Sequence, residues 1–108
     1  MDESLYEAAK NVFANRSGFR AIITHRGDGY ATYLENGEIT SNVMFHLFIA
    51  SELVGELRES HSNGTNIWLS SKEIATNPDI LPTVKDLLAQ HTKTPPGKRF
   101  FVELNYSI

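Results

Sequence analysis

The stretch ITHRGDGYATYLENGEITS, residues 23–41, decides the fold that this sequence predicts. Asn36-Gly37 lies between two runs rich in β-branched and aromatic residues, and it is a strong two-residue hairpin signal because both positions tolerate a positive φ. Residues 26–29, RGDG, offer two glycines around an aspartate, which also predicts a tight reversal. The stretch therefore predicts two turns that separate three antiparallel strands.

The tripeptide at residues 26–28 is also one that some extracellular proteins present to cell-surface receptors. Nothing else in the chain supports an extracellular protein, because it has no cysteine and residues 1–11, MDESLYEAAKN, lack the features of a signal peptide. The most apolar run, residues 43–50, is shorter than the roughly 20 residues of a membrane span. We interpret the tripeptide as a turn and expect a cytoplasmic protein without a membrane role.

The rest of the chain predicts three helices, one short helical turn and two further strands around this meander. Apolar residues at helical spacing, an N-cap signal or a proline marks each helix. The unbroken triplet around Trp68 predicts a short strand that is buried on both faces. The expected helices cover residues 3–15, 43–61 and 83–91, a short helical turn is expected to open at residues 70–73, and the expected strands cover residues 67–71 and 99–108.

These elements predict one domain, residues 1–108, of the α/β (mixed α+β) class. An N-terminal helix precedes the order β-β-β-α-β-α-β, and right-handed crossovers would make the last two strands parallel to the first. The expected sheet is mixed and five-stranded, with the order 3-2-1-4-5. The last strand alternates apolar and polar residues, which is typical of a half-exposed strand.

This order resembles the core of the ribonuclease H-like superfold over residues 18–106. The resemblance depends on TSNVMFHLFIASELVGEL, residues 40–57, as the long helix and on NIWLSS, residues 66–71, as the next strand. It implies three acids that hold two divalent metal ions, but the corresponding segments read IITH, VMFH and LSSK. All three acids are absent, so the resemblance implies a member without that catalytic centre.

Other catalytic or cofactor motifs are also missing from the sequence. The serines form no nucleophile elbow and the glycines form no phosphate-binding loop or dinucleotide fingerprint, so we expect no cofactor. The four histidines match no common zinc pattern, and we expect no metal site. One of them, His46, interrupts an apolar run, and it is either a hydrogen-bonded core histidine or a proton carrier. The histidines are His25, His46, His61 and His91.

The sequence thus favours a small acidic protein, of net charge −3, that binds another protein as a regulator, inhibitor or adaptor and is not an enzyme. A homodimer through the last strand would use the free backbone groups of a sheet edge. The alternative is a nucleic-acid-binding protein or a nuclease-like enzyme with an unrecognised site, for which residues 93–99 are the most basic segment. The expected binding residues are Arg26, Asp28, Tyr30, Lys98 and Arg99.

Overall fold

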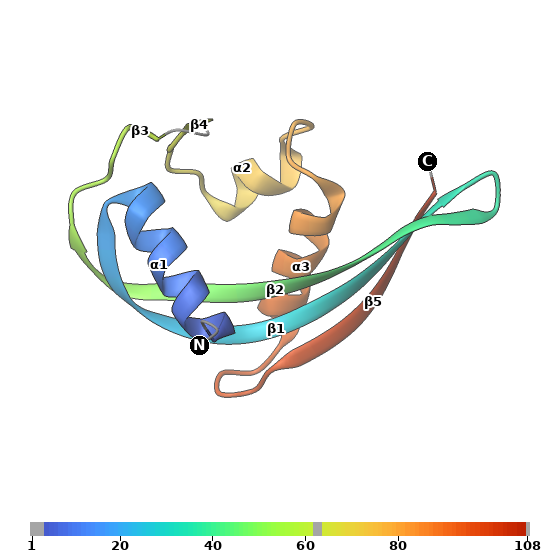
Figure 1. Cartoon of the computed structure of the whole chain (residues 1–108), viewed down its shortest axis with the longest axis horizontal. Helices are drawn as coiled ribbons and strands as arrows, with labels where there is room; N and C mark the ends of the chain where they lie inside the picture. The colour runs from blue at the N-terminus through green and yellow to red at the C-terminus, as the bar shows by residue number, and fades with distance from the viewer. Residues whose placement is uncertain (1–3, 62–63, 108) are drawn as a thin grey trace. The chain divides into compact units, whose positions relative to one another are not determined.

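The computed structural model of the chain describes residues 4–61 and 64–107 (Figure 1). Contacts divide the chain into two compact units, each built from two segments. The first unit comprises Met1–His25 and Phe48–Ser70, and the second comprises Arg26–Leu47 and Ser71–Ile108. We describe each unit by itself, and the expectation of one domain stays a prediction. In the part of the chain that is described, no helix is long and apolar enough to cross a membrane.

The first unit begins with helix α1, Leu5–Ser17, which confirms the amphipathic helix expected at residues 3–15. The Ser4 side chain caps its start by accepting a hydrogen bond from the backbone N–H of Glu7 at 3.1 Å. Gly18 ends it in the left-handed region, at φ 86°. A Cβ atom on Gly18 would lie 2.6 Å from the carbonyl oxygen of Glu56, so the chain passes too closely for any side chain there.

Two long strands follow α1, and they are joined by the expected hairpin turn. Strand β1 spans Phe19–Glu35 and strand β2 spans Glu38–Gly55. Asn36 and Gly37 have φ values of 54° and 80°, as a tight hairpin requires. The second predicted turn is wrong, because residues 26–29 continue β1 without a reversal.

The long helix expected at residues 43–61 is also wrong, since β2 continues to Gly55. An unbroken apolar run has no periodicity that separates a helix from a buried strand, and the aromatic and branched residues here favour the strand. Asn42, which the helix would have used as its N-cap, instead accepts a hydrogen bond from the Thr32 hydroxyl at 3.1 Å.

The sheet has three strands in the order β2-β1-β5, in place of five strands in the order 3-2-1-4-5. Strand β5, Phe100–Ser107, runs parallel to β1 with Gly27 opposite Phe100 (Figure 1). Strands β3, Ser60–His61, and β4, Gly64–Thr65, form a separate two-stranded ladder. Strand β5 lies at an edge of its sheet, and a homodimer through this edge stays a prediction.

The predicted buried strand at residues 67–71 is absent from the described structure. The segment has no regular secondary structure before α2, and Ile67 and Trp68 are 70% and 67% exposed. The apolar triplet was therefore misleading, because its side chains lie at the surface of the first unit.

The helices of the second unit agree with the sequence pattern. Helix α2 spans Ser71–Thr76, and α3 spans Pro82–Lys93 with proline in its first turn. Thr94 then leads into the proline-rich connector at residues 95–97, which cannot continue a helix.

Two glycines of β1 make room for the core of the second unit. A Cβ atom on Gly27 would lie 2.4 Å from the ring of Phe100, and one on Gly29 would lie 2.7 Å from Leu87. Neither glycine has a positive φ, so the conformational reason expected for them is wrong. Their function is steric, because Phe100 and Leu87 are buried against the strand at these positions.

Aromatic side chains at the far end of the same unit add specific contacts. The rings of Tyr33 and Tyr106 stack with centroids 5.4 Å apart, and the hydroxyl of Tyr33 lies 3.0 Å from that of Thr83 on α3. The Tyr106 hydroxyl donates to Asp86 Oδ2 at 2.6 Å. Partial burial, followed by this hydrogen bond, raises the pKa of Tyr106 to about 12. The phenol can therefore donate this hydrogen bond from β5 to α3 up to a higher pH than an ordinary tyrosine would.

We predict that Gly27→Ala will lower the free energy of unfolding by roughly 1 to 3 kcal/mol, because the new methyl group collides with the Phe100 ring. Urea denaturation of Gly27→Ala, Phe100→Leu and the double variant would measure this. Phe100→Leu removes the ring atoms in the way, so the double variant should lose less stability than the sum of the single variants. Strict additivity would contradict the proposed collision.

Candidate functional site

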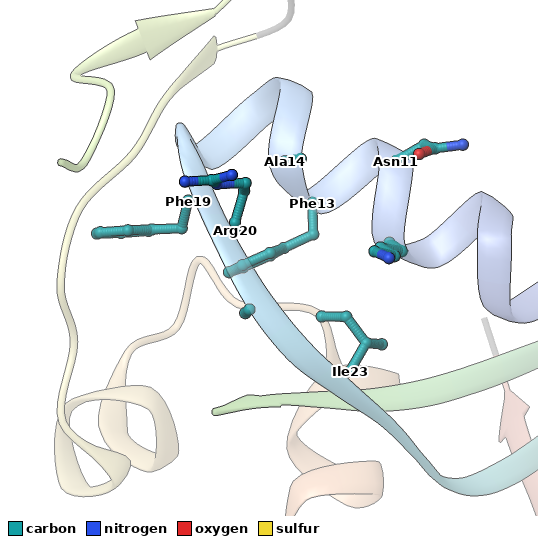
Figure 2. A pocket seen from close by; sticks show the side chains of 8 residues that line it. Asn11, Phe13, Ala14, Phe19, Arg20 and Ile23 are labelled. Atoms are coloured by element: carbon teal, nitrogen blue, oxygen red, sulfur yellow. The ribbon is translucent and has the colours of Figure 1, made fainter. Parts of the chain in front are cut away.

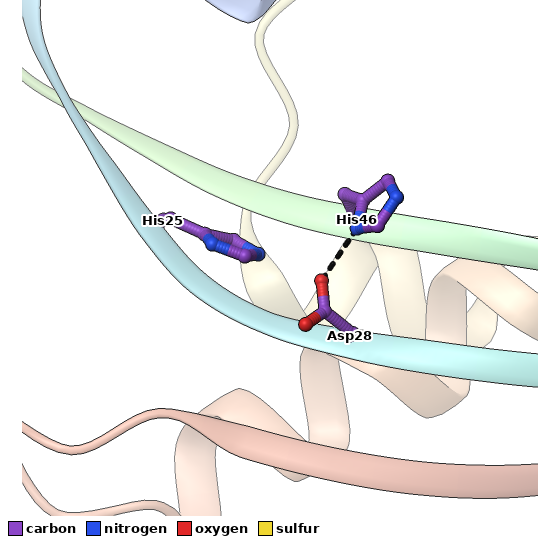
Figure 3. Close-up of side chains that lie close together, drawn as sticks. All are labelled: His25, Asp28 and His46. Carbon is purple, nitrogen blue, oxygen red and sulfur yellow. Dashed lines mark hydrogen bonds and ion pairs between the residues drawn. The ribbon is translucent and has the colours of Figure 1, made fainter. Parts of the chain in front are cut away.

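The most promising chemical group in the second unit is a carboxylate and imidazole pair on neighbouring strands. Asp28 projects from β1 and His46 projects from β2, with Nδ1 of His46 2.5 Å from Oδ1 of Asp28 (Figure 3). The side chain of His46 is 33% exposed and that of Asp28 is 28% exposed. The pair is thus ordered by a direct hydrogen bond while a small molecule or water can still reach it.

The hairpin explains why these two residues meet. The turn at Asn36-Gly37 folds β2 back along β1, so residues at similar distances from the turn lie opposite each other. Asp28 and His46 have this relation. The sequence alone did not show it, because residues 43–61 were expected to be a helix, which would have carried His46 away from the sheet.

The short contact also indicates which ring nitrogen of His46 carries a hydrogen. An ionised carboxylate only accepts hydrogen bonds, so Nδ1 of His46 must carry the hydrogen in this pair. In neutral His46 the lone pair is then on Nε2, which is the arrangement of a general base that an acid orients. The alternative of a proton carrier, left open for His46, therefore has the acid partner that the sequence did not reveal.

The pair is a poor binding site for magnesium. It offers one carboxylate and one imidazole, whereas Mg²⁺ prefers oxygen ligands in octahedral geometry. The two ligand atoms that lie nearest to each other, Nδ1 of His46 and Oδ1 of Asp28, moreover already form a hydrogen bond. The other histidines also have local structural contacts: the His25 ring stacks on Phe48 at 4.8 Å, and Nδ1 of His91 accepts from Arg26. The side chain of His61 lies outside the described part of the chain.

Arg26 was expected as an exposed charge in a turn, but it is buried, with 9% of its surface exposed. Its Nε donates to Nδ1 of His91 at 2.7 Å, and its two terminal nitrogens donate to four backbone carbonyls. These carbonyls lie in the last turn of α3, at its C-cap and in the connector after it, and they belong to His91, Thr94, Pro95 and Lys98. Arg26 therefore has a structural function in the second unit.

The other expected binding residues lie on β1 and in the connector before β5. Tyr30 is 37% exposed on β1, in register with Glu103 of β5. Lys98 and Arg99 are exposed in the connector before β5. A binding role for these three residues stays a prediction.

A second candidate site is a cavity of about 260 Å³ in the first unit, between α1 and the start of β1 (Figure 2). Phe13, Phe19 and Ile23 provide apolar walls, and Lys10 and Arg20 provide two cationic side chains. Its lining contains no carboxylate, so this cavity does not fit a metal ion and is better suited to an anionic or neutral ligand. Sequence reasoning missed it, because the helical spacing of apolar residues does not show which side chains enclose a cavity.

We predict that Arg26→Lys will destabilise the protein by roughly 2 to 4 kcal/mol, since a single ammonium cannot replace the guanidinium fork and buried carbonyls lose their donors. Thermal and urea unfolding would measure the loss. The exposed Arg20→Lys is the matched control and should change stability by less than about 0.5 kcal/mol. Equal effects of the two substitutions would show that the buried contacts of Arg26 do not stabilise the fold.

Comparison with known proteins corrects the resemblance that the sequence suggested. No protein-family model and no curated protein matches the chain. A similar solved structure is the crystal structure of the mutator MutT protein from Bacillus halodurans, with a TM-score of 0.79 and 21% identity. The match covers 99% of this chain and 70% of that chain. At this identity it shows the fold alone.

The MutT fold is different from the ribonuclease H-like superfold, so that resemblance is wrong. The interpretation of the chain as a regulator, inhibitor or adaptor without a catalytic centre is contradicted by the same likeness. In fold, then, the chain is similar to MutT.

Proposed function

We propose that the protein is a nucleotide hydrolase of the MutT (Nudix) kind, which cleaves a phosphate linkage with water. The observation that carries this proposal is the likeness to MutT over 99% of the chain at a TM-score of 0.79. The accessible pair of Asp28 and His46 supports it, because hydrolysis needs a group that takes a proton from water. The expected place of action is the cytoplasm.

In the proposed reaction, His46 is the general base and Asp28 orients it. The carboxylate of Asp28 accepts from Nδ1–H of His46 and stabilises the imidazolium that forms. Nε2 takes one proton from a water molecule while the water oxygen forms a bond to phosphorus. The existing P–O bond breaks, and its electron pair leaves with the departing phosphate or nucleotide group. The proton on Nε2 then passes to solvent or to the leaving group.

The sheet gives this pair a defined geometry. Asp28 and His46 belong to two strands joined by a tight hairpin, and side chains on strands are held more precisely than side chains on loops. Their partial exposure admits water and substrate without rearrangement of the backbone.

Enzymatic phosphoryl transfer generally uses divalent cations to neutralise charge on the phosphates. The pair of Asp28 and His46 fits Mg²⁺ poorly, because only one of its two side chains offers oxygen ligands, and the lining of the cavity beside α1 contains no carboxylate. The function assigned to this chain is therefore limited to proton transfer by His46 and orientation of its ring by Asp28.

We predict that His46→Ala and Asp28→Asn will each lower kcat by roughly 10²- to 10⁴-fold while KM changes little, because they remove proton transfer and not substrate binding. Release of phosphate and pyrophosphate from nucleoside di- and triphosphates would be measured by chromatography. Asp79→Asn, an exposed acid on the loop between α2 and α3, is the matched control and should retain full activity.

Each variant should be compared by thermal melting, since loss of folding would also abolish activity. If folded His46→Ala protein hydrolyses nucleotides as fast as the unaltered protein, the assignment of the base is wrong. If the unaltered protein hydrolyses none of these nucleotides, the proposed function itself is wrong.

A further inference from the structure

The first unit contains an aromatic cavity that the proposed chemistry does not use. It has a volume of about 280 Å³, near the lower end of the roughly 300 to 1000 Å³ typical of ligand pockets. Such a volume suits one planar ring system better than a whole nucleotide. The lining residues are Phe13, Ser17, Phe19, Ala50, Leu53, Leu57, Asn66, Ile67 and Trp68.

Trp68 is the most unusual of these residues, because its large apolar side chain is 67% exposed. Its ring lies against Phe19 at a centroid distance of 5.9 Å and an interplanar angle of 50°. This tilted contact supports one side of the indole and leaves much of its surface available. A planar ligand that stacks on the indole would remove this apolar surface from water.

One serine holds the backbone that carries the two phenylalanines of the cavity. The Ser17 hydroxyl donates to the carbonyl oxygen of Phe13 at 2.6 Å and accepts from the backbone N–H of Phe19 at 3.1 Å. These bonds fix the junction of α1 and β1, from which Phe13 and Phe19 project, as Figure 2 shows. The aromatic surfaces are thus formed before a ligand binds, which lowers the entropic cost of binding.

Asn66 determines which hydrogen-bonding group the cavity can offer to the polar edge of a ligand. Its Nδ2 donates to the backbone carbonyls of Arg16 at 2.5 Å and Arg58 at 2.8 Å. Because both partners are acceptors, the nitrogen must face them, and the amide orientation is fixed. The group that Asn66 can present to a ligand is therefore the oxygen Oδ1, which is an acceptor.

We infer that this cavity is a binding subsite for a nucleobase that carries an exocyclic amino group. Every nucleobase can stack on an aromatic side chain, so stacking alone does not select one base. A hydrogen-bond acceptor at the edge of the bound base favours a base that carries an N–H₂ donor. The choice of a nucleobase rests on the proposed nucleotide hydrolase function. The cavity lies wholly within the first unit, so its binding can be measured apart from the chemistry of Asp28 and His46.

Nucleosides provide the sharpest test, because they contain the base but have no phosphate to hydrolyse. Trp68 is the single tryptophan of the chain, so its fluorescence reports directly on the cavity. Adenosine and guanosine should quench it saturably, and ribose 5-phosphate, which has no base, should not. At least one of the two should bind roughly 2- to 12-fold more tightly than inosine, which lacks an exocyclic amino group.

We predict that Trp68→Ala will weaken nucleoside binding, measured by calorimetry, by roughly 5- to 150-fold, and that Trp68→Phe will restore part of it. Tyr6→Ala, which removes another exposed aromatic ring of the first unit outside the cavity, is the control and should leave binding unchanged. Thermal melts should be similar for the two Trp68 variants, because the replaced side chain is largely exposed.

Failure of this inference is distinguishable from failure of the hydrolase proposal. No saturable quenching by adenosine or guanosine, or unchanged binding in folded Trp68→Ala protein, would overturn the subsite. Equal binding of inosine, adenosine and guanosine would overturn the selection by Asn66. Saturable nucleoside binding that survives His46→Ala supports the subsite whether or not hydrolysis is found.

Discussion

The second unit depends on the contact between one buried guanidinium and the end of a helix. The last carbonyls of a helix have no partner within it, and Arg26 supplies donors to them from β1. Its positive charge also faces the negative end of the helix dipole. The same side chain binds the carbonyls of Pro95 and Lys98, which lead directly into β5. Arg26 thus determines where α3 ends and where β5 begins, next to the pairing of Gly27 with Phe100.

The tetrapeptide at residues 26–29 shows why part of the fold could not be predicted. Its composition is typical of a turn, but the four residues are part of a strand. There Gly27 leaves room for the Phe100 ring, and Gly29 leaves room for Leu87. Those partners lie far along the chain, so no local pattern reveals them. Local signals did predict α1, α3 and the Asn36-Gly37 hairpin correctly, because caps, prolines and turn residues act within a few positions. The apolar runs around His46 and Trp68 misled, since hydrophobicity without a period does not specify secondary structure.

The candidate sites could be predicted only in part from the sequence, for a related reason. Asp28 was singled out, but as an exposed turn residue, and His46 had no acid partner while its segment was expected to be helical. Their hydrogen bond joins β1 to β2, and it could not be expected while the segment that carries His46 was predicted to be a helix. The aromatic cavity was hidden because Trp68 was expected in the sheet interior. In each case the sequence drew attention to the residue but did not show where its side chain lies in the fold.

The parallel pairing of β1 with β5 has a consequence for the order of folding. The hairpin of β1 and β2 closes a short loop and can form within microseconds, whereas Gly27 meets Phe100 only after most of the chain has been brought together. Until then β1 has an open edge beside two glycines, with backbone groups that other chains can pair with. Docking of β5 is therefore the step that protects a nascent or heated molecule from aggregation, and substitutions that slow it would reduce the yield of folded protein more than its equilibrium stability.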